Sequence, residues 1–258
     1  MPNGPDIFKH ALPHAADDAH KYDNGHLAIF AAPDLTGATR LSAQAALRIG
    51  AGLVSVLAMS RGDVYRASLP PDIMVTQDAL GGLNKVSAVL AGPGGIAPAH
   101  HAALDDLPGD MPRVIDSSAF PAPAGEAQFP PCTVLTSHDG EFARMFPDMK
   151  GSREDMARRA AAYCGAIIVL KGPVTYIAHP DGRCVINNHP DAALAKGGTG
   201  DVLAGFIAGL MAQHMAAFEA ACAGVWTHSE CGARLGRGLI ASDLPGEVPA
   251  VLKGFFGD

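Results

Sequence analysis

Short apolar runs recur along the chain, and longer segments of mixed polarity separate them. The runs are apolar at consecutive positions rather than at alternate ones, which is typical of strands buried on both faces of a parallel sheet. On this pattern we predict strands at residues 26–31, 53–58, 86–91, 113–116, 133–136 and 166–170.

The segments between these strands favour helices. In residues 38–49 the apolar side chains recur at a spacing that places them on one face of a helix. Ser152 is a suitable N-cap and predicts a helix over residues 153–164. Further helices are expected at residues 202–212 and 216–235. This alternation predicts a three-layer α/β fold, in which helices cover both faces of a mostly parallel central sheet.

One segment interrupts the alternation of strands and helices, and its pattern predicts a β-hairpin. Residues 174–179 and 183–187 are strand-like, and Pro180-Asp181-Gly182 joins them with turn-forming residues. We therefore predict an antiparallel pair at one edge of the sheet. No repeat or linker divides residues 22–258, which we expect to form one domain. Residues 1–21 are polar and interrupted by prolines, and we expect a loosely ordered lead-in there.

Composition narrows the class of protein. The 258 residues carry a formal net charge of −7 and contain no run of Lys or Arg, so we expect no nucleic-acid partner. The five cysteines are widely spaced and form no CxxC pair, which favours reduced thiols in a cytoplasmic protein. The longest apolar stretch, residues 202–212, is shorter than a bilayer span, so we expect no membrane partner.

Glycines and polar residues gather directly after several predicted strands. They are residues 92–95, Asp116, residues 136–141 and residues 171–173. Each cluster alone is explained by ordinary turn chemistry. Because ligands of open parallel sheets bind beyond the carboxyl ends of the strands, the clusters together predict a ligand site at this edge.

The segment Gly-Gly-Thr-Gly-Asp at residues 197–201 leads directly into an apolar helix. Its glycines permit backbone conformations that a β-carbon would penalise. Together with the free N–H groups and the dipole of the helix, such a turn predicts a site for a phosphate or a transferring phosphoryl group. Asp201 then has two interpretations. It is a base that takes a proton from a hydroxyl attacking phosphorus, or it is a helix N-cap.

Several motifs combine into one family pattern. Gly-Ala-Gly-Leu-Val at residues 50–54 and His-Asp-Gly-Glu-Phe at residues 138–142 are its most specific parts. Thr36-Gly37-Ala38, Gly92-Pro93-Gly94, Val169-Leu170-Lys171-Gly172 and Gly197-Gly198-Thr199-Gly200-Asp201 complete the set. With these motifs, the chain over about residues 22–258 resembles the ADP/ATP-dependent NAD(P)H-hydrate dehydratases. These are the C-terminal YjeF-type domains of the ribokinase-like superfamily.

The resemblance implies a repair reaction on nicotinamide nucleotides. The family dehydrates the hydrated form of NADH or NADPH back to the working coenzyme, with ADP or ATP as co-substrate and Mg²⁺ as cofactor, and we expect ADP here. The substrate hydroxyl first takes a phosphoryl group, and phosphate then leaves as the ring double bond is restored. Because hydroxide is a poor leaving group, consumption of a nucleotide has a clear chemical purpose.

The resemblance also implies roles for residues around the glycine-rich turn. Asp201 would deprotonate the substrate hydroxyl and contact the hydrated nicotinamide. The backbone N–H groups of Gly198, Thr199 and Gly200 would hold the transferring phosphoryl group. Glu141 would help to hold Mg²⁺ through water.

Two binding regions follow from the same resemblance. The nucleotide site would be lined by Lys171, Gly172, Pro173, Val174, Thr175 and Gly200. The dinucleotide substrate would contact Ala38, Gly94 and His138. For His138 the alternative is a histidine at the start of a helix that bonds only to backbone, and for Lys171 it is a solvated surface lysine.

Three segments depart from the family pattern. Ala31-Ala32-Pro33 stands where Gly-Gly-Ser is usual, Ser118 removes the second carboxylate of an Asp-Ala-Asp segment, and Ser137 replaces a proline. Because β-carbons and a proline stiffen the first of these turns, we expect an effect on substrate affinity or identity.

Two other functions are compatible with the motifs. One is a small-molecule kinase of the same superfamily, similar to hydroxyethylthiazole kinases, and the other is a non-catalytic nucleotide sensor. The resemblance further implies a homo-oligomer, often a tetramer. It also implies an epimerase, either as a separate partner or as a missing N-terminal domain.

Overall fold

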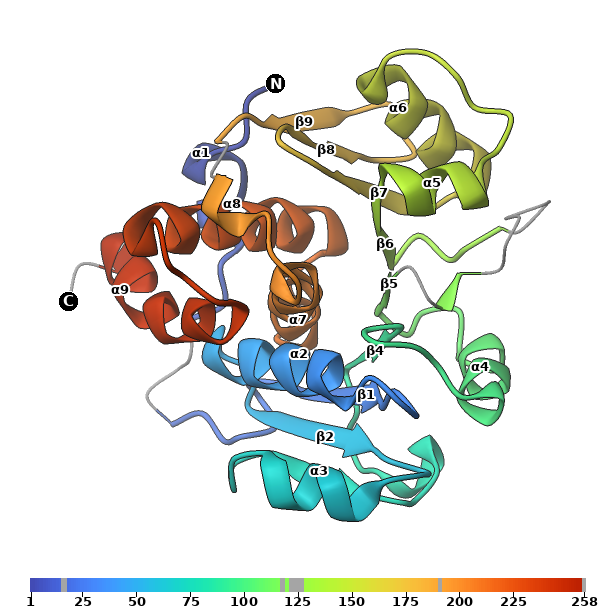
Figure 1. The fold of residues 1–258 in the computed structure, drawn as a ribbon, viewed down its shortest axis with the longest axis vertical. Coiled ribbons are helices and arrows are strands. Elements are labelled where there is room, and N and C mark those ends of the chain that lie inside the picture. The colour runs from blue at the N-terminus through green and yellow to red at the C-terminus, as the bar shows by residue number, and fades with distance from the viewer. Residues whose placement is uncertain (15–17, 117–118, 121–127, 190–191, 257–258) are drawn as a thin grey trace.

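The computed structural model describes residues 1–14, 18–116, 119–120, 128–189 and 192–256. Within these residues nine strands form one sheet in the order β3-β2-β1-β4-β5-β6-β7-β8-β9 (Figure 1). The strands are β1 His26–Phe30, β2 Leu53–Leu57, β3 Met74–Thr76, β4 Ala88–Ala91, β5 Arg113–Asp116, β6 Thr133–His138, β7 Ile167–Lys171, β8 Thr175–Ala178 and β9 Cys184–Asn187.

Strand direction places the loops that follow β1 and β4 to β7 at the same edge of this sheet. All pairs from β3 to β7 are parallel, whereas β8 and β9 pair antiparallel as a hairpin at the edge. The order of the strands reverses at β1, which lies between β2 and β4. Loops that leave the carboxyl ends of strands on the two sides of such a point diverge and open a crevice.

Helices cover both faces of the sheet, as the sequence predicts. The α-helices are α1 Pro5–Phe8, α2 Thr36–Arg48, α3 Gly62–Ser68, α4 Pro98–Asp105, α5 Asp139–Met145, α6 Arg153–Cys164, α7 Thr199–Ala212, α8 Ala217–Leu235 and α9 Leu244–Phe256. In Figure 1 the layer of α2, α7, α8 and α9 lies on one side of the sheet, and α4, α5 and α6 lie on the other.

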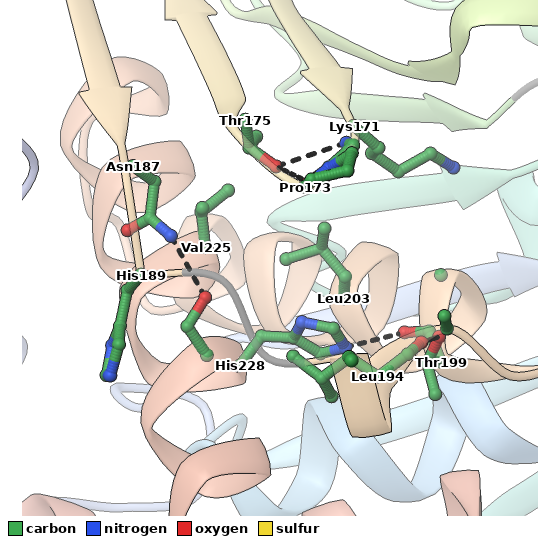
Figure 2. A pocket seen from close by; sticks show the side chains of 15 residues that line it. Lys171, Pro173, Thr175, Asn187, His189, Leu194, Thr199, Leu203, Val225 and His228 are labelled. Atoms are coloured by element: carbon green, nitrogen blue, oxygen red, sulfur yellow. Dashed lines mark hydrogen bonds between the residues drawn. The ribbon is translucent and has the colours of Figure 1, made fainter.

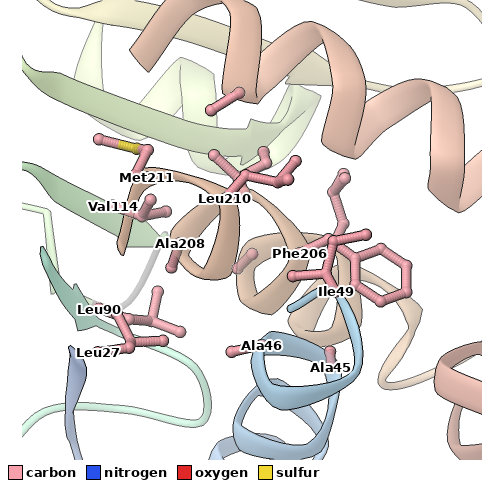
Figure 3. Packing of buried hydrophobic residues seen from close by; sticks show 14 of the residues in the cluster. Leu27, Ala45, Ala46, Ile49, Leu90, Val114, Phe206, Ala208, Leu210 and Met211 are labelled. Carbon is pink, nitrogen blue, oxygen red and sulfur yellow. The ribbon is translucent and has the colours of Figure 1, made fainter. Parts of the chain in front are cut away.

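The two layers have separate hydrophobic cores, and β1 shows how the sheet serves both. Leu27 and Ile29 belong to the core under α2 and α7, while Ala28 and Phe30 belong to the core under α4 to α6. All four side chains are essentially buried, which explains the run of consecutive apolar residues in the sequence. Figure 3 shows the first core, in which Phe206, Leu210 and Met211 of α7 meet residues of α2 and the sheet.

Helix α7 is the most buried helix because it packs between the sheet and three other helices. Its glycines allow an unusually close approach to α2. A β-carbon on Gly205 would lie 2.3 Å from the Ser42 carbonyl oxygen, and one on Gly209 would lie 2.5 Å from Ile49 Cγ2. This contact fixes where the first turn of α7 stands.

The structure confirms the predicted strands to within a few residues and adds elements that the pattern did not indicate. The added elements are β3, α1, α3, α4 and α9, together with α5, whose start was raised only in the alternative interpretation of His138. Strand β3 is a short edge strand that is not buried, so it leaves no apolar run. Helix α9 contains Pro249 and two glycines, so its intrinsic helix propensity is low and packing decides its conformation.

The expectation of a loosely ordered lead-in is wrong for the start of the chain. Phe8 is fully buried, and its ring centroid lies 5.8 Å from that of Trp226 and 5.9 Å from that of Phe255. Pro2 forms a parallel bridge with Ile186, beside β9. The buried ring of Phe8 and the backbone bonds of residues 1–3 to Ile186 fix this segment, which composition alone does not reveal.

Within the described part of the chain, no helix combines the length and the apolar character that crossing a bilayer requires. All five cysteines are unpaired, and four of them are buried.

Candidate functional site

The glycine-rich turn forms the start of α7. Gly198 is the N-cap and has a left-handed backbone with φ 90°, which glycine adopts without strain. The Thr199 hydroxyl donates to the Leu194 carbonyl oxygen at 2.8 Å and also lies 3.0 Å from the Lys196 carbonyl oxygen. These bonds hold the turn closed. The backbone N–H groups at the start of the helix have no intrahelical acceptor, so the turn can bind an anion.

Asp201 lies inside the first turn of α7, and Gly198 occupies the N-cap position instead. The alternative interpretation of Asp201 as a cap is therefore wrong. The pKa of its carboxyl is raised to about 6, mainly by burial and also by the charge of Asp116, against the opposing charge of Lys171; the charge of Glu141 adds to the increase. The side chain is thus mostly ionised at neutral pH but more basic than an ordinary carboxylate, which would suit a group that accepts a proton.

Lys171, at the end of β7, connects the carboxylates of this region. Its Nζ lies 3.0 Å from Asp116 Oδ1 and 3.9 Å from Glu141 Oε2. Thr136 donates its hydroxyl to the same Asp116 oxygen at 2.5 Å. The Lys171 side chain is only 17% exposed, so the alternative of a solvated surface lysine is wrong. A β-carbon on Gly200 would lie 3.4 Å from its Nζ, so the ammonium faces the turn at the start of α7.

His138 is the N-cap of α5 and forms a capping box with Glu141. Its Nδ1 accepts from the Gly140 and Glu141 backbone N–H groups at 3.0 and 3.3 Å, and its Nε2 lies 3.1 Å from Glu141 Oε1. The backbone-bonded alternative for His138 therefore describes its capping role. The imidazole is nevertheless 61% exposed, so one face remains accessible to a ligand.

Ala38 and Gly94 lie together at the crevice beside β1. Gly94 has φ 78°, and a β-carbon there would lie 2.5 Å from the Leu35 carbonyl oxygen and 2.8 Å from Ala38 Cβ. The neighbouring turn after β1 is held from two sides. The Ala32 N–H donates to Thr39 Oγ1 at 3.0 Å, and the Tyr65 hydroxyl donates to the Ala32 carbonyl at 2.7 Å. The altered turn at residues 31–33 is therefore well anchored.

The other two departures from the family pattern are Ser137 and Ser118. Ser137 is buried inside β6 and pairs with Leu170 of β7, so the strand continues to His138. Ser118 lies outside the described residues.

A cavity of about 450 Å³ lies between the start of α7, the middle of α8 and the β7–β8 turn (Figure 2). Of the residues expected to bind the nucleotide, Lys171, Gly172, Pro173, Thr175 and Gly200 line it. Val174 is not among the described lining residues. Its carbonyl instead accepts from Arg153 Nη1 at 2.5 Å.

Several lining or supporting residues were not expected from the sequence. Arg153 bonds the carbonyls of Lys171 and Val174 and so fixes the β7–β8 turn. Asn187, His228 and Ser229 line the cavity from β9 and α8. The one available signal was a histidine in a predicted helix that is rich in Ala and Cys, at residues 216–235, since a buried histidine needs a partner.

Mg²⁺ fits this region only through shared ligands. The described residues contain no group of three or more His, Cys, Asp or Glu side chains that could hold a metal ion. Asp116 is already paired with Lys171 and Thr136, whereas Glu141 is bonded to the start of α5. Mg²⁺ commonly binds through one or two carboxylates, water and substrate phosphates, and the residues present suit that mode.

The fold and site together define a ribokinase-like α/β protein with an anion turn and a carboxylate beside it. The dehydratase of Bacillus subtilis, co-crystallised with ATP and Mg²⁺, has the same fold. It superimposes with a TM-score of 0.84 at 29% identity, over 99% of each chain.

Sequence comparisons give the family. The sequence model described as NAD(P)H-hydrate dehydratase matches residues 28–248. The ADP-dependent (S)-NAD(P)H-hydrate dehydratase of Neisseria meningitidis is 32% identical over 93% of this chain and 88% of its own length. The bifunctional NAD(P)H-hydrate repair enzyme Nnr of Escherichia coli is 35% identical over 92% of this chain but 49% of its own length, so the chain spans about half of that relative. The chain belongs to the NAD(P)H-hydrate dehydratase family, as the motifs predicted.

Proposed function

We propose that this protein dehydrates (S)-NAD(P)H hydrate to NAD(P)H with consumption of a nucleotide. The observation that carries the proposal is the position of Asp201, in the first turn of α7 and directly after the anion-binding turn. A carboxylate would repel a bound phosphate, so a site that only binds nucleotide gains nothing from it. Family membership supports the same reaction.

In the proposed first step, Asp201 accepts the proton of the substrate hydroxyl. The hydroxyl oxygen attacks the terminal phosphorus of the nucleotide, and the bond between that phosphorus and the bridging oxygen breaks. The backbone N–H groups of Gly198, Thr199 and Gly200 would hold the phosphoryl oxygens, because N–H groups at the start of a helix lack intrahelical acceptors and favour negative charge. Lys171 supports the same charge from the end of β7.

The second step is an elimination. The C–O bond to phosphate breaks and its electron pair leaves with the phosphate oxygen, while the adjacent carbon loses a proton and the ring double bond is restored. Phosphorylation thus turns hydroxide into a good leaving group. The products are NAD(P)H, phosphate and the shortened nucleotide.

The two substrates have separate places in this proposal. The nucleotide occupies the cavity lined by Lys171 and Thr175, and the dinucleotide lies over Ala38, Gly94 and His138, beside the crevice at β1. When bound, Mg²⁺ would neutralise phosphate charge, with Glu141 reaching it through water. ADP is the proposed co-substrate, since the relative from Neisseria meningitidis is named as ADP-dependent.

The test is direct. The protein is incubated with Mg²⁺, enzymatically prepared NADH hydrate, and either ADP or ATP, and absorbance of the dihydronicotinamide ring is followed. We expect a rise that requires a nucleotide and is faster with ADP. A flat trace with both nucleotides, from folded protein that binds AMP, would contradict the proposal.

A kinase or a sensor is favoured over the dehydratase only by the altered turn at residues 31–33. A kinase would leave a stable phosphorylated acceptor, which mass spectrometry of the products detects, and a sensor would bind nucleotide without any turnover. The retained Asp201 argues against a sensor, and family membership supports the dehydratase over a kinase.

Three further points belong to this proposal. An epimerase, as partner or as an additional domain, would supply the correct epimer of the substrate. The protein would act as a homo-oligomer, with a tetramer as the expected form. The unpaired cysteines support a cytoplasmic location.

A further inference from the structure

Two consecutive residues of α8 line the proposed nucleotide cavity, and each has a hydrogen-bonding group that no described residue uses. His228 is 9% exposed and Ser229 is 6% exposed, and both line the cavity (Figure 2). His228 Nε2 lies 2.9 Å from the Thr199 carbonyl oxygen. A carbonyl can only accept, so Nε2 carries the hydrogen and Nδ1 keeps a free lone pair.

The lone pair on Nδ1 is a permanent feature of the site. Burial lowers the pKa of His228 to about 4, so the ring is neutral near pH 7. No partner for Nδ1 exists in the described part of the chain. The ring cannot exchange its tautomer without losing the bond to Thr199, which belongs to the anion turn. His228 therefore presents a fixed acceptor.

Ser229 presents the complementary donor. Its oxygen accepts from Asn187 Nδ2 at 3.0 Å, and Asn187 Oδ1 accepts from Asn3 Nδ2 at 3.0 Å. The bond from Asn3 fixes which end of the Asn187 amide points at Ser229. Among the described residues, the Ser229 hydroxyl hydrogen has no acceptor, so it is available to a ligand.

We infer that His228 and Ser229 select an adenine base over a 6-oxopurine in this cavity, which rests on the proposed binding of an adenine nucleotide. The 6-amino group of adenine donates to His228 Nδ1, and a ring nitrogen of the base accepts from Ser229. In guanine or hypoxanthine a carbonyl oxygen replaces the amino group. Two lone pairs then face each other in a buried site, where an unmatched polar pair is costly.

Binding measurements test this without the nicotinamide substrate. Dissociation constants of the wild-type protein are measured by calorimetry for ADP, for inosine diphosphate and for N6,N6-dimethyl-ADP, which lacks the amino hydrogens. We expect ADP to bind at least about tenfold more tightly than either analogue, because each leaves Nδ1 without a donor. Equal affinity for the three nucleotides would overturn the inference.

A variant assigns the selection to the histidine. In His228→Phe, which fills the same space without an acceptor, the preference for ADP over inosine diphosphate should fall to within about threefold. The matched control is Thr227→Val, since Thr227 is a buried neighbour on α8 that is not among the cavity-lining residues. It should keep the full preference.

The outcomes distinguish a failure of the His228 inference from a failure of the proposed dehydratase function. An unchanged preference in folded His228→Phe overturns the role of His228, although the dehydratase proposal would stand. Absence of binding by every nucleotide would contradict the proposed function as well. If His228→Phe shows no cooperative thermal unfolding, the three wild-type constants alone decide the inference.

Discussion

Asp201 places a carboxylate directly after the turn that we propose binds phosphate. The α7 dipole and the neighbouring N–H groups favour this carboxylate, whereas burial and two other carboxylates oppose its ionisation. The opposing effects leave its pKa at about 6. A residue in this state can accept a proton near neutral pH and return it later, which is the property that the proposed reaction requires.

Replacement of Asp201 by Asn should abolish most of the turnover and leave the nucleotide site intact. We expect kcat to fall by about 10²- to 10⁴-fold, because the amide cannot accept the hydroxyl proton. ADP binding should be unchanged or slightly tighter, since one repulsive charge is removed. Stopped-assay turnover and calorimetric binding measure the two effects. Near-normal kcat would remove Asp201 from its proposed role.

The same variant should be more stable than the wild type at pH 8. The native pKa of about 6 lies above the ordinary value of 3.8, so the folded state binds more protons between these values and stability falls as pH rises through them. Asp201→Asn removes this penalty, and we expect a gain of about 1–2 kcal/mol in the free energy of unfolding. Urea unfolding at pH 8 and at pH 3.5 tests this, since the gain should vanish at the lower pH.

Activity should also follow the ionisation of Asp201. We expect kcat/KM for the hydrated substrate to be constant above pH 7 and to fall about tenfold per pH unit well below pH 6, because only the ionised carboxylate acts as base. Circular dichroism at each pH controls for unfolding. A profile that stays flat down to pH 4.5 would show that no group with this pKa controls the reaction.

At the scale of elements, the packing of α7 on α2 decides the position of the glycine-rich turn that we propose to be catalytic. Ser42 of α2 donates its hydroxyl to the Asp201 carbonyl at 2.9 Å, and Gly205 lets the helices touch one turn further along. A side chain at residue 205 would separate the helices and displace the first turn of α7 together with its carboxylate. The helix contact is therefore part of the site.

Gly205→Ala should destabilise the protein by about 1–3 kcal/mol, because the new β-carbon would lie 2.3 Å from the Ser42 carbonyl oxygen. It should also lower kcat. Gly246→Ala in α9 is the matched control, since no heavy atom lies within 4 Å of its added β-carbon. That change should be neutral or stabilise the helix by up to about 1 kcal/mol. Equal effects of the two substitutions in urea unfolding would show that the α2–α7 contact is not tight.

How far the sequence predicts the structure also differs between elements. Strands such as β4 and β7 are buried on both faces, and their unbroken apolar runs identify them. The start of helix α5 was raised only as the alternative for His138, because its cap is a histidine rather than one of the common capping residues. Asp201 and Lys171 were found from local motifs, whereas His228 acts through a bond to Thr199, which is distant in sequence, and no local pattern reveals that contact.

At the scale of the whole molecule, the start of the chain connects the β9 edge of the sheet with helices α8 and α9. Residues 1–3 extend the sheet beside β9, and Phe8 joins α1 to α8 and α9 through Trp226 and Phe255. In Figure 1 the N-terminus lies beside β9, and α1 lies over α8. The segment is thus part of the packed domain, and its removal should lower the free energy of unfolding of the whole domain.

Phe8→Ala should lower the free energy of unfolding by about 3–4 kcal/mol, because it removes a fully buried ring and leaves a cavity between two helices. Lys9→Ala is the control, since its side chain is exposed and should contribute less than about 0.5 kcal/mol. ADP affinity should be the same in both variants, because neither residue lines the nucleotide cavity described above. A loss of less than about 1 kcal/mol in Phe8→Ala would mean that the segment unfolds independently of the domain.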